Sequence, residues 1–515
     1  MKENRSLILR ILTVFLAIGV FMAGVPVTAS ATEITVCAPL KGDGTAESPY
    51  EISSKEELYW FAQLVDGELE GVAKNEKANA ILVDNITVNE KVLENGELVS
   101  DVSGLIEWNP IAYSYGCEYS GTFDGKGHTI SGLYCDSGSS CAGVFGEVSR
   151  EVKNLNVTDS YFCSYSATGG ICGINSSNVK NCSVSAVVEG DGSCDNVGGI
   201  AGISYRDIYN CSFSGKAYGK KYVGGICGYS GGTIRDCKNT GSVTGDMYVG
   251  GIGGFLGAEY HWDGTNRNYN AGDVKGRTAV GGIFGLLDFG TYLYNSYNTG
   301  SVTATESGAG GVMGETVFND MSVPMIYNCY SLGSVFAPIY SGSFNGGNGG
   351  GGFYGNGLYY VKGTAIDGGG YEQTGIGKSR VGSNGGYHSC LTAITREELE
   401  SGRIAYLLQN NQDYDDLVWG QIDYSTGAHP ILTNDEAYRV DKYTNINGTE
   451  IYMSGGTGDF DNDKVINEND YEKMIKCALG EANIEEEVSL AKSDVNADGV
   501  VDVLDVSLLE RKLSK

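Results

Sequence analysis

The stretch Gly224-Gly225-Ile226-Cys227-Gly228 is one of seven copies of a glycine motif that decide the fold. Four further copies of Gly-Gly-Ile-x-Gly start at residues 169, 198, 250 and 281, and degenerate copies start at 142 and 310. Successive starts are therefore 27, 29, 26, 26, 31 and 29 residues apart. Self-similarity at a nearly fixed period of this length is the sequence signature of a repeat architecture.

Each repeat also carries a turn residue and a Gly-x-Val triplet. The turn residue is Asn181, Asn210, Asp236, Asn295 or Asn328, and the triplets begin at Gly241, Gly272, Gly300 and Gly333. The β-rich pieces between them are too short to form a domain alone, but they can bury apolar faces by stacking on the next copy. This pattern predicts a β-solenoid. The alternative is a β-propeller, whose blades need about 40–50 residues.

Composition sets the class of protein. The chain has 515 residues with 78 Gly but only 7 Pro, which argues against collagen and against a Pro/Gly linker. A hydrophobic content of 41% excludes disorder throughout. A formal net charge of −29 argues against a nucleic-acid partner, because phosphate binding needs clustered Lys and Arg.

The N-terminus predicts export from the cell. Lys2, Arg5 and Arg10 precede an apolar run over 11–25, and the small-residue triplet Ala29-Ser30-Ala31 follows it. This order is typical of a secretory signal peptide, here residues 1–31. The alternative is a membrane anchor, but glycines and a proline break the run. No later stretch approaches the roughly 20 apolar residues of a span, so we expect a secreted, extracellular protein without a transmembrane anchor.

The repeats resemble the GLUG-type repeats of bacterial secreted and surface proteins. The preceding segment, 123–133, resembles the opening turn of right-handed parallel β-helix proteins. The resemblance covers about residues 38–435 and implies a right-handed parallel β-helix with coils of 26–31 residues. Such repeats are specific for architecture and poor for activity, since they occur in adhesins, peptidase appendages and proteins of unknown role.

Two capping boxes predict helices that close the solenoid. Ser54-Lys55-Glu56-Glu57 precedes an amphipathic run from Leu58, and Thr395-Arg396-Glu397-Glu398 precedes another from Leu399. Helices at these places would cover strand edges that otherwise invite aggregation. The segments 419–421 and 429–432 resemble the usual C-terminal closure of such chains, and the glycine-rich residues 341–370 are expected to form loose loops.

The 14 cysteines can be interpreted in two ways, as disulfide partners or as buried free thiols. Cys182, Cys211 and Cys237 occupy the same place in successive repeats. Stacked coils put such positions about 4.8 Å apart, a separation compatible with disulfides. The other interpretation is a ladder of small buried side chains, which free cysteine fills well. No CxxC pair occurs, which argues against zinc.

Two acidic loops near the C-terminus form the most specific ligand-binding pattern in the sequence. Each 12-residue loop places side-chain oxygens at positions 1, 3, 5, 9 and 12 and a valine carbonyl at position 7. Each loop is followed by a predicted helix with apolar periodicity, over 471–479 and 506–513. Calcium takes six to eight oxygen ligands, so each loop can wrap one ion. The predicted ligands are Asp459, Asp461, Asp463, Val465, Asn467 and Asp470 in loop 1, and Asp494, Asn496, Asp498, Val500, Asp502 and Asp505 in loop 2.

Residues 456–515 resemble a type I dockerin, the module that plugs into cohesin domains of cellulosome scaffoldins. The aspartate that closes each loop at position 12 is the dockerin form of the loop. The resemblance implies two Ca²⁺ ions, a pseudo-twofold pair of helices and a cohesin partner. It places the cohesin contacts at loop positions 10 and 11 and at a basic helix residue, which here are Glu468, Asn469, Lys476, Val503, Leu504 and Arg511.

Two features depart from the dockerin pattern. Position 6 of loop 1 is Lys464 instead of glycine, and a non-glycine residue in that tight turn costs about 1 kcal/mol. Calcium site 1 is therefore expected to be the weaker one. Positions 10 and 11 also differ between the two halves, which puts two-way cohesin binding in doubt.

No catalytic motif is present. The sequence has no Gly-x-Ser-x-Gly elbow, no HExxH and no P-loop. The candidate catalytic residues are Glu259 and Asp263, which lie in a segment that also contains a tyrosine, a histidine and a tryptophan. Acids beside aromatics suit acid–base work on sugars. The alternative for this segment is a protruding surface loop.

Three hypotheses of function follow. In the first, a non-catalytic solenoid is delivered to a cellulosome-like complex and binds polysaccharide or another surface. In the second, it is a polysaccharide-degrading hydrolase or lyase tethered in the same way. In the third, it is a structural or adhesive surface protein. The predicted domains are an N-terminal cap region (32–122), GLUG-like solenoid repeats (123–340), glycine-rich loops with a C-terminal cap (341–450) and the all-α calcium-binding dockerin (456–515).

Overall fold

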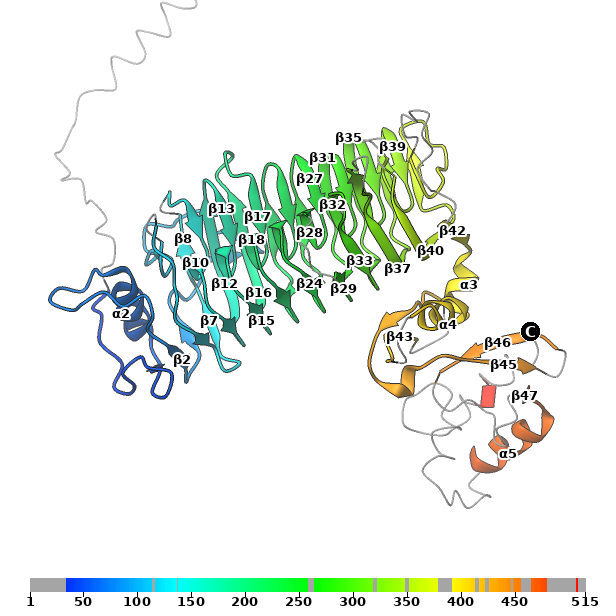
Figure 1. Cartoon of the computed structure of the whole chain (residues 1–515), viewed down its shortest axis with the longest axis horizontal. Coiled ribbons are helices and arrows are strands. Elements are labelled where there is room, and N and C mark those ends of the chain that lie inside the picture. The colour runs from blue at the N-terminus through cyan, green and yellow to red at the C-terminus, as the bar shows by residue number, and fades with distance from the viewer. Residues whose placement is uncertain are drawn as a thin grey trace, which may run out of the picture.

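The chain forms a long β-solenoid with helices near both ends (Figure 1). The computed structural model describes residues 34–454, apart from 114–115, 137, 258–263, 318–321, 348–351, 378–390, 413–415, 422–425 and 446–447, together with 465–478 and 506–507. The solenoid makes about 11 turns. The predicted mainly β solenoid with capping helices is confirmed.

Each coil contributes strands to four stacks of one large parallel sheet, which has 33 strands among the described residues. The first stack contains β1 (Tyr50–Ile52), β2 (Ala80–Leu82), β6 (Phe123–Asp124), β11 (Val152–Lys153), β15 (Val179–Lys180), β19 (Ile208–Tyr209), β24 (Ile234–Arg235), β29 (Thr265–Asn266), β33 (Tyr292–Tyr294), β37 (Met325–Ser331) and β40 (Tyr354–Val361). The second contains β3 (Ile86–Thr87), β7 (Thr129–Ser131), β12 (Asn156–Ser164), β16 (Ser183–Gly190), β20 (Ser212–Phe213), β25 (Lys238–Asn239), β30 (Tyr269–Asn270), β34 (Tyr297–Asn298) and β42 (Leu391–Ile394).

The third and fourth stacks complete this sheet. The third contains β8 (Tyr134–Cys135), β21 (Lys216–Tyr218), β26 (Ser242–Thr244), β31 (Val274–Gly281), β35 (Val302–Gly310), β38 (Val335–Ala337) and β41 (Ala365–Asp367). The fourth contains β9 (Cys141–Ala142), β13 (Ala167–Gly169), β17 (Asn196–Gly198), β22 (Tyr222–Gly224), β27 (Met247–Gly250) and β39 (Ile339–Gly342).

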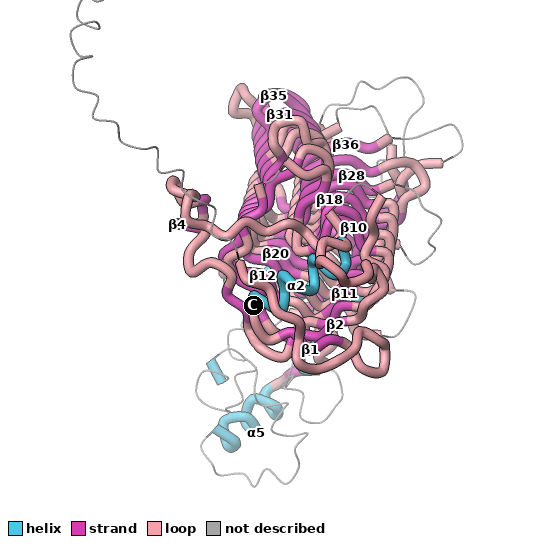
Figure 2. Tube along the Cα trace, turned by 90° about the vertical axis from the view of Figure 1, so that its left-hand side faces the viewer, coloured by secondary structure: helices cyan, strands magenta, loops and turns pink. Residues whose placement is uncertain are grey.

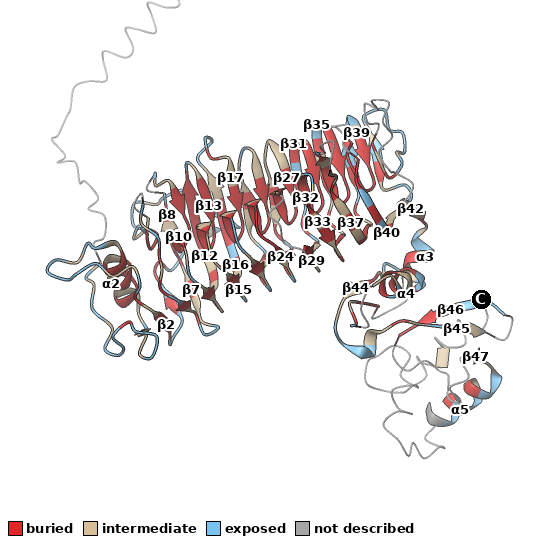
Figure 3. Cartoon of the chain, in the orientation of Figure 1, coloured by how far each residue is buried: buried red, intermediate tan, exposed pale blue. Residues whose placement is uncertain are grey.

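The fifth stack is a separate parallel sheet of seven strands. It contains β10 (Phe145–Val148), β14 (Cys172–Asn175), β18 (Ala201–Ser204), β23 (Cys227–Ser230), β28 (Gly253–Leu256), β32 (Phe284–Leu287) and β36 (Met313–Thr316). The strands of all five stacks are largely buried along the rod (Figure 3). Identical positions of successive repeats lie side by side, so Cys227 pairs with Gly253 of the next coil.

The glycine motif lies at the turn between the fourth and fifth stacks, where backbones approach too closely for a side chain. A Cβ on Gly224 would lie 2.1 Å from the carbonyl oxygen of Cys227. A Cβ on Gly225 would lie 2.2 Å from the carbonyl oxygen of Gly251 in the next coil. Both distances are far inside van der Waals contact, so the period of the motif is a steric requirement of stacking.

The recurrent asparagine after the first stack adopts left-handed backbone geometry. Asn181, Asn210, Asn295 and Asn328 have φ between 45° and 54°. Asparagine tolerates this region better than other non-glycine residues because its short side chain bonds locally. The side chains also join coils: Asn210 Nδ2 donates to Asn181 Oδ1 at 2.8 Å.

The twelve cysteines whose side chains are described are free thiols. Cys182, Cys211 and Cys237 are buried on successive coils, and the backbone N–H of Cys211 donates to Cys237 Sγ at 3.4 Å. This arrangement is the buried ladder, one of the two alternatives left open by the sequence.

Helix α2 (Lys55–Asp66) lies across the N-terminal end of the coil (Figure 2). Its Leu58 and Phe61 are fully buried in the same core cluster as solenoid residues. Ser54 caps the helix by accepting the Glu57 N–H, as predicted. The carboxylate of Glu57, however, accepts hydrogen bonds from the backbone N–H and the hydroxyl of Ser53. The reciprocal bond of the capping box therefore goes to the residue before Ser54. The nearby hairpin β4 (Leu93–Glu94) and β5 (Glu97–Leu98) packs on the flank of the first coils.

The C-terminal cap begins with α3 (Arg396–Glu400) and α4 (Arg403–Asn410). The capping box at Thr395 and Glu398 is confirmed, with both reciprocal bonds present. Gly402, at φ 83°, separates the two helices and divides the predicted apolar run between them. The short hairpin β43 (Trp419–Gly420) and β44 (Ile431–Leu432) follows.

This cap packs against the side of the last coils. Tyr269, Tyr297 and Tyr330 stack on successive coils with ring centroids 5.1 Å apart. Trp419 covers Tyr297 and Tyr330, and its Nε1 donates to Asn295 Oδ1 at 3.0 Å.

The expectation of loose loops over 341–370 is wrong for a large part of that range. Strand β40 pairs with β37 at six positions, and β41 pairs with β38. Glycine here allows the backbones of neighbouring coils to approach closely, since a Cβ on Gly355 would lie 1.8 Å from the carbonyl oxygen of Ile326.

A small sheet and a helix follow the cap. Strand β45 (Asp441–Asn445) pairs antiparallel with β46 (Glu450–Met453) and parallel with β47 (Val465–Ile466). Helix α5 (Glu468–Ala478) begins three residues before the predicted start at Tyr471. A short 3-10 helix, η1 (Glu436–Tyr438), precedes β45. No helix among the described residues is long and apolar enough to cross a membrane.

Candidate functional site

Residues Asn467 and Asp470 of predicted calcium loop 1 start helix α5. The Asn467 backbone N–H donates to Asp470 Oδ2 at 3.1 Å, and the Asn469 N–H donates to Asn467 Oδ1 at 2.8 Å. This is a reciprocal cap made by Asn and Asp in place of Ser and Glu. It explains why the helix begins at Glu468, before the apolar periodicity does. The predicted ligands at positions 9 and 12 are therefore held together by the helix that follows them.

Helix α5 has one buried and one exposed face. Asp470 and Met474 are fully buried. Glu468, Asn469 and Lys476, the three predicted cohesin contacts that are described on this helix, are all exposed. They share that face with Glu472 and Lys473, which lie at helical spacing between them. The face is charged and open to a protein partner.

The remaining predicted residues of this module lie outside the described residues. They are Asp459, Asp461 and Asp463 of site 1, Asp494, Asn496, Asp498, Val500, Asp502 and Asp505 of site 2, and the cohesin-contact candidates Val503, Leu504 and Arg511. Within the described part of the chain no group of three or more His, Cys, Asp or Glu side chains is placed to hold a metal.

The chemistry of the predicted donor set fits calcium. Every donor in loop 1 is a carboxylate, amide or carbonyl oxygen, which is the ligand type that Ca²⁺ prefers. Asp470 and Asn467 are joined by the cap hydrogen bond, and Val465, whose carbonyl is the predicted ligand at position 7, lies in strand β47. These residues would hold the ion, and the bound ion would neutralise the carboxylates.

A second candidate site lies in the N-terminal cap, where sequence reasoning found none. A pocket of about 290 Å³ lies between α2 and the segment 109–113, and it is lined by Tyr59, Ala62, Gln63, Asp66, Glu68, Asn109 and Tyr113. Asp66 Oδ2 accepts the Ala112 N–H at 3.1 Å, whereas its Oδ1 is buried without a hydrogen-bond partner among the described residues.

Burial raises the pKa of Asp66 to about 7, with repulsion from Glu68 adding to the effect. Ala112, whose N–H donates to Asp66, has a left-handed backbone conformation with φ 60°. Non-glycine residues in that region and carboxyls with a strongly raised pKa both concentrate at functional sites. The only sequence feature that could have indicated this site is an aspartate at the end of a predicted helix, where its negative charge opposes the helix dipole.

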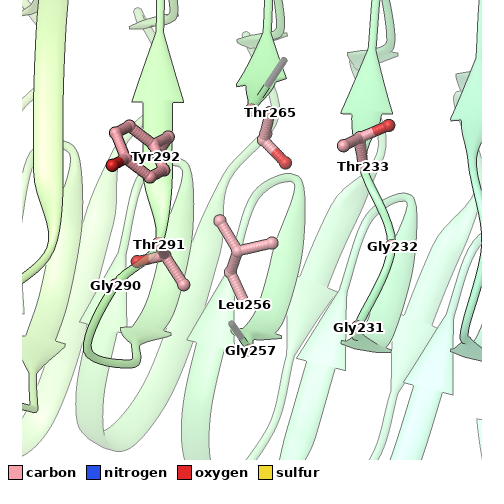
Figure 4. A pocket seen from close by; sticks show the side chains of 10 residues that line it. Gly231, Gly232, Thr233, Leu256, Gly257, Thr265, Gly290, Thr291 and Tyr292 are labelled. Atoms are coloured by element: carbon pink, nitrogen blue, oxygen red, sulfur yellow. The ribbon is translucent and has the colours of Figure 1, made fainter. Parts of the chain in front are cut away.

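A third candidate site is a pocket beside the segment that carries the catalytic candidates Glu259 and Asp263. Those two residues lie outside the described residues, but the pocket is lined by Gly257 and Gly264, which flank the segment. Its volume is about 270 Å³, and Thr233, Thr265, Thr291 and Tyr292 lie along successive coils at its wall (Figure 4). Among the described residues that line it there is no acidic side chain.

Comparison with known proteins identifies two modules. Residues 457–514 match the type I dockerin domain, and residues 219–244 match the GLUG motif. The chain therefore carries a C-terminal dockerin after a solenoid with GLUG repeats, as the resemblance implied.

Similarity over longer stretches is weaker. Halomucin from Haloquadratum walsbyi is 29% identical over 163 residues, which are 31% of this chain but only 2% of halomucin. A crystal structure of a candidate immunoglobulin A1 protease from Bacteroides ovatus covers 77% of this chain and 96% of its own, with 19% identity and a TM-score of 0.36. That score is too low to establish a common fold.

Proposed function

We propose that this dockerin-bearing chain docks by calcium-dependent cohesin binding into a cellulosome-like extracellular complex, with a solenoid that binds or acts on polysaccharide. The observation that carries the docking function is the type I dockerin match at 457–514. The exposed face of α5, with Glu468, Asn469 and Lys476, supports it, because these are the residues to which the resemblance assigns cohesin contact.

Two calcium ions are proposed, one in each loop. Site 1 comprises Asp459, Asp461, Asp463, the Val465 carbonyl, Asn467 and Asp470, and site 2 comprises Asp494, Asn496, Asp498, the Val500 carbonyl, Asp502 and Asp505. Each loop collects acidic side chains that repel one another without an ion. Calcium relieves this repulsion, so the cohesin-binding surface is expected to be ordered only when calcium is bound.

Docking is tested by calorimetry of the full chain with a type I cohesin, in calcium and in excess EDTA. We expect binding in calcium and its loss in EDTA. Asp470→Ala should weaken binding at least tenfold, because it removes both a ligand and the helix cap. Asp84→Ala, an exposed substitution in the N-terminal region, is the matched control and should bind normally. Tight binding in EDTA would refute the assignment.

The enzymatic alternative, a glycoside hydrolase or lyase, is favoured by one observation. The pocket in the N-terminal cap is lined by two acidic residues, Asp66, whose pKa burial raises to about 7, and Glu68. A pair of carboxyl groups, one of them with a raised pKa, is the arrangement used for acid–base work on glycosidic bonds. Glu259 and Asp263 remain alternative candidates. A structural or adhesive surface role is the outcome if neither binding nor turnover occurs.

Polysaccharide action is tested by incubating the full chain with plant and storage polysaccharides. New chain ends would identify an enzyme, and depletion onto the insoluble fraction without cleavage would identify a binding protein. If Asp66 is the acid, Asp66→Asn should abolish new ends while Glu259→Gln/Asp263→Asn should not. The reverse result would assign the chemistry to the loop near 257–264, and neither cleavage nor depletion would leave the scaffold or adhesive role.

Export and domain boundaries are part of the same proposal. A signal peptide over 1–31 delivers the chain to the medium, and its units are the cap region 32–122, the repeats 123–340, the C-terminal region 341–450 and the dockerin 456–515. Sequencing the N-terminus of the secreted protein tests the first boundary, which predicts Thr32 as the first residue.

A further inference from the structure

We infer that the hairpin β45–β46 is a structural part of the calcium-binding module, so that calcium binding at loop 1 and folding of this hairpin stabilise each other. The inference rests on the proposed calcium site. It means that the dockerin is seated on the C-terminal cap in a defined orientation and is not carried on a free tether.

The first observation is a shared sheet. Strand β45 is central, with β46 on one side and β47 on the other. Thr444 pairs with Val465 and Asn445 with Ile466. Val465 is position 7 of loop 1, the position whose backbone carbonyl is predicted to bind calcium. Pairing fixes the backbone of a strand, so the hairpin fixes the peptide that carries this ligand.

The second observation is a shared apolar core. Tyr443 and Met453 of the hairpin and Met474 of α5 are buried in one cluster. Ile451, Tyr471 and Val506 pack against that cluster from its edge. Val506 follows directly on loop 2, so residues beyond both loops meet the hairpin. Burial of these apolar side chains stabilises the hairpin and the module together, because each part supplies some of the shared core.

The third observation places the other side of the hairpin on the solenoid cap. Tyr452 and Val440 are buried with Ala405 of α4, and the rings of Tyr406 and Tyr452 lie 5.3 Å apart. The backbone N–H of Gln421 donates to the Tyr438 carbonyl at 3.0 Å. The hairpin therefore contacts the cap with one set of side chains and the calcium module with another, as the position of β45 and β46 between α4 and α5 shows (Figure 1).

The arrangement has a consequence for loop 1. Lys464 at position 6 makes the turn costlier than glycine would. A neighbouring strand that holds the next two residues reduces the ordering that calcium must otherwise supply, which offsets this cost. Coupling is reciprocal, so calcium should stabilise the hairpin as much as the hairpin favours calcium.

The same packing selects the surface offered to cohesin. Met474 and Tyr471 face the shared core, so this side of α5 is occupied. The exposed side, with Glu468, Asn469, Glu472, Lys473 and Lys476, is the one left for a partner.

The test is Met453→Ala in the full chain, with calcium binding measured by calorimetry. Removing this buried side chain from the hairpin should weaken one of the two calcium sites by roughly 5- to 100-fold. Met313→Ala is the matched control, since Met313 is equally buried but lies in the solenoid on β36. It should leave both calcium affinities unchanged. Equal affinities in Met453→Ala and the parent chain would overturn the inference.

Hydrogen exchange of the unmodified chain gives a second readout that does not depend on any variant folding. Adding calcium should slow exchange of the amides in 441–453 together with those in 465–478. Calcium binding that protects 465–478 but leaves 441–453 unchanged would overturn the coupling while preserving the proposed function. A chain that binds no calcium would overturn both.

Discussion

Asp66 shows how a single residue can depart from local rules and thereby indicate a site. It ends α2, where a carboxylate opposes the helix dipole, and it lies half-buried beside a second acid. One oxygen accepts the Ala112 N–H, and the other is buried without a hydrogen-bond partner among the described residues. Such a group destabilises the fold whenever it is ionised, so its presence calls for a functional reason.

Asp66→Asn should make the protein more stable at pH 8 but not at pH 4. The pKa of Asp66 is about 7 in the folded chain and near its ordinary value of 3.8 in the unfolded chain, so the folded state holds a proton that the unfolded state has released. Stability is therefore lost as pH rises from about 4 to about 7, and asparagine avoids that loss. Because Asp66 is partly exposed, we expect a gain of about 1–2 kcal/mol and not the full value of the shift.

Denaturant unfolding of the N-terminal cap, followed by Trp60 and Trp108 fluorescence at both pH values, measures this effect. Asp84→Asn, at an exposed position, is the control and should show no pH-dependent gain. An Asp66→Asn variant that is equally destabilised at pH 4 and pH 8 would show that the carboxyl is not protonated in the folded chain.

At the scale of the element, an internal asparagine ladder joins three coils. Asn239, Asn270 and Asn298 are fully buried on β25, β30 and β34. Asn239 Nδ2 donates to Asn270 Oδ1 at 2.7 Å, and Asn270 Nδ2 donates to Asn298 Oδ1 at 2.8 Å. Each side chain also bonds the glycine two residues later, so the ladder is satisfied within the core.

Asn270→Ala should destabilise the solenoid by about 2–4 kcal/mol, because it leaves buried donors and acceptors without partners. The Gly272 N–H and the Asn239 amide would both lose their acceptor. Thermal unfolding by calorimetry measures the loss. Asn85→Ala, at an exposed position, is the matched control, with an expected change below about 1 kcal/mol. Equal effects of the two substitutions would mean that the ladder adds nothing.

For the whole molecule, a stack of coils should be most stable at its centre. Each coil contacts only its neighbours, so an inner coil must break two interfaces to open and a terminal element breaks one. Amides of β16 to β31 should therefore exchange more slowly than those of β1 and β43 to β46. Hydrogen exchange with mass spectrometry tests this order, and uniform protection along the chain would contradict it.

Several features followed from the sequence because they depend on neighbours in the chain or on the repeat itself. The 26–31-residue period required stacking, since a short β-rich repeat cannot bury its apolar face alone. The capping box at Thr395 and the cap at Ser54 are local hydrogen-bond patterns, and both occur. The dockerin was identified from the spacing of oxygen-bearing side chains, which the comparison confirms as a type I dockerin.

Other features were decided only by tertiary structure, because they depend on residues far apart in the chain. The raised pKa of Asp66 arises where α2 meets the segment near Ala112, 46 residues away. The burial of Tyr297 and Tyr330 depends on Trp419 folding back onto the side of the coils. The pairing of β47 with β45 likewise joins the predicted calcium loop 1 to the strand that follows the cap. The sequence by itself determined that the chain stacks and carries a type I dockerin, because periodicity and residue spacing are local. Long-range packing decided which polar groups become buried.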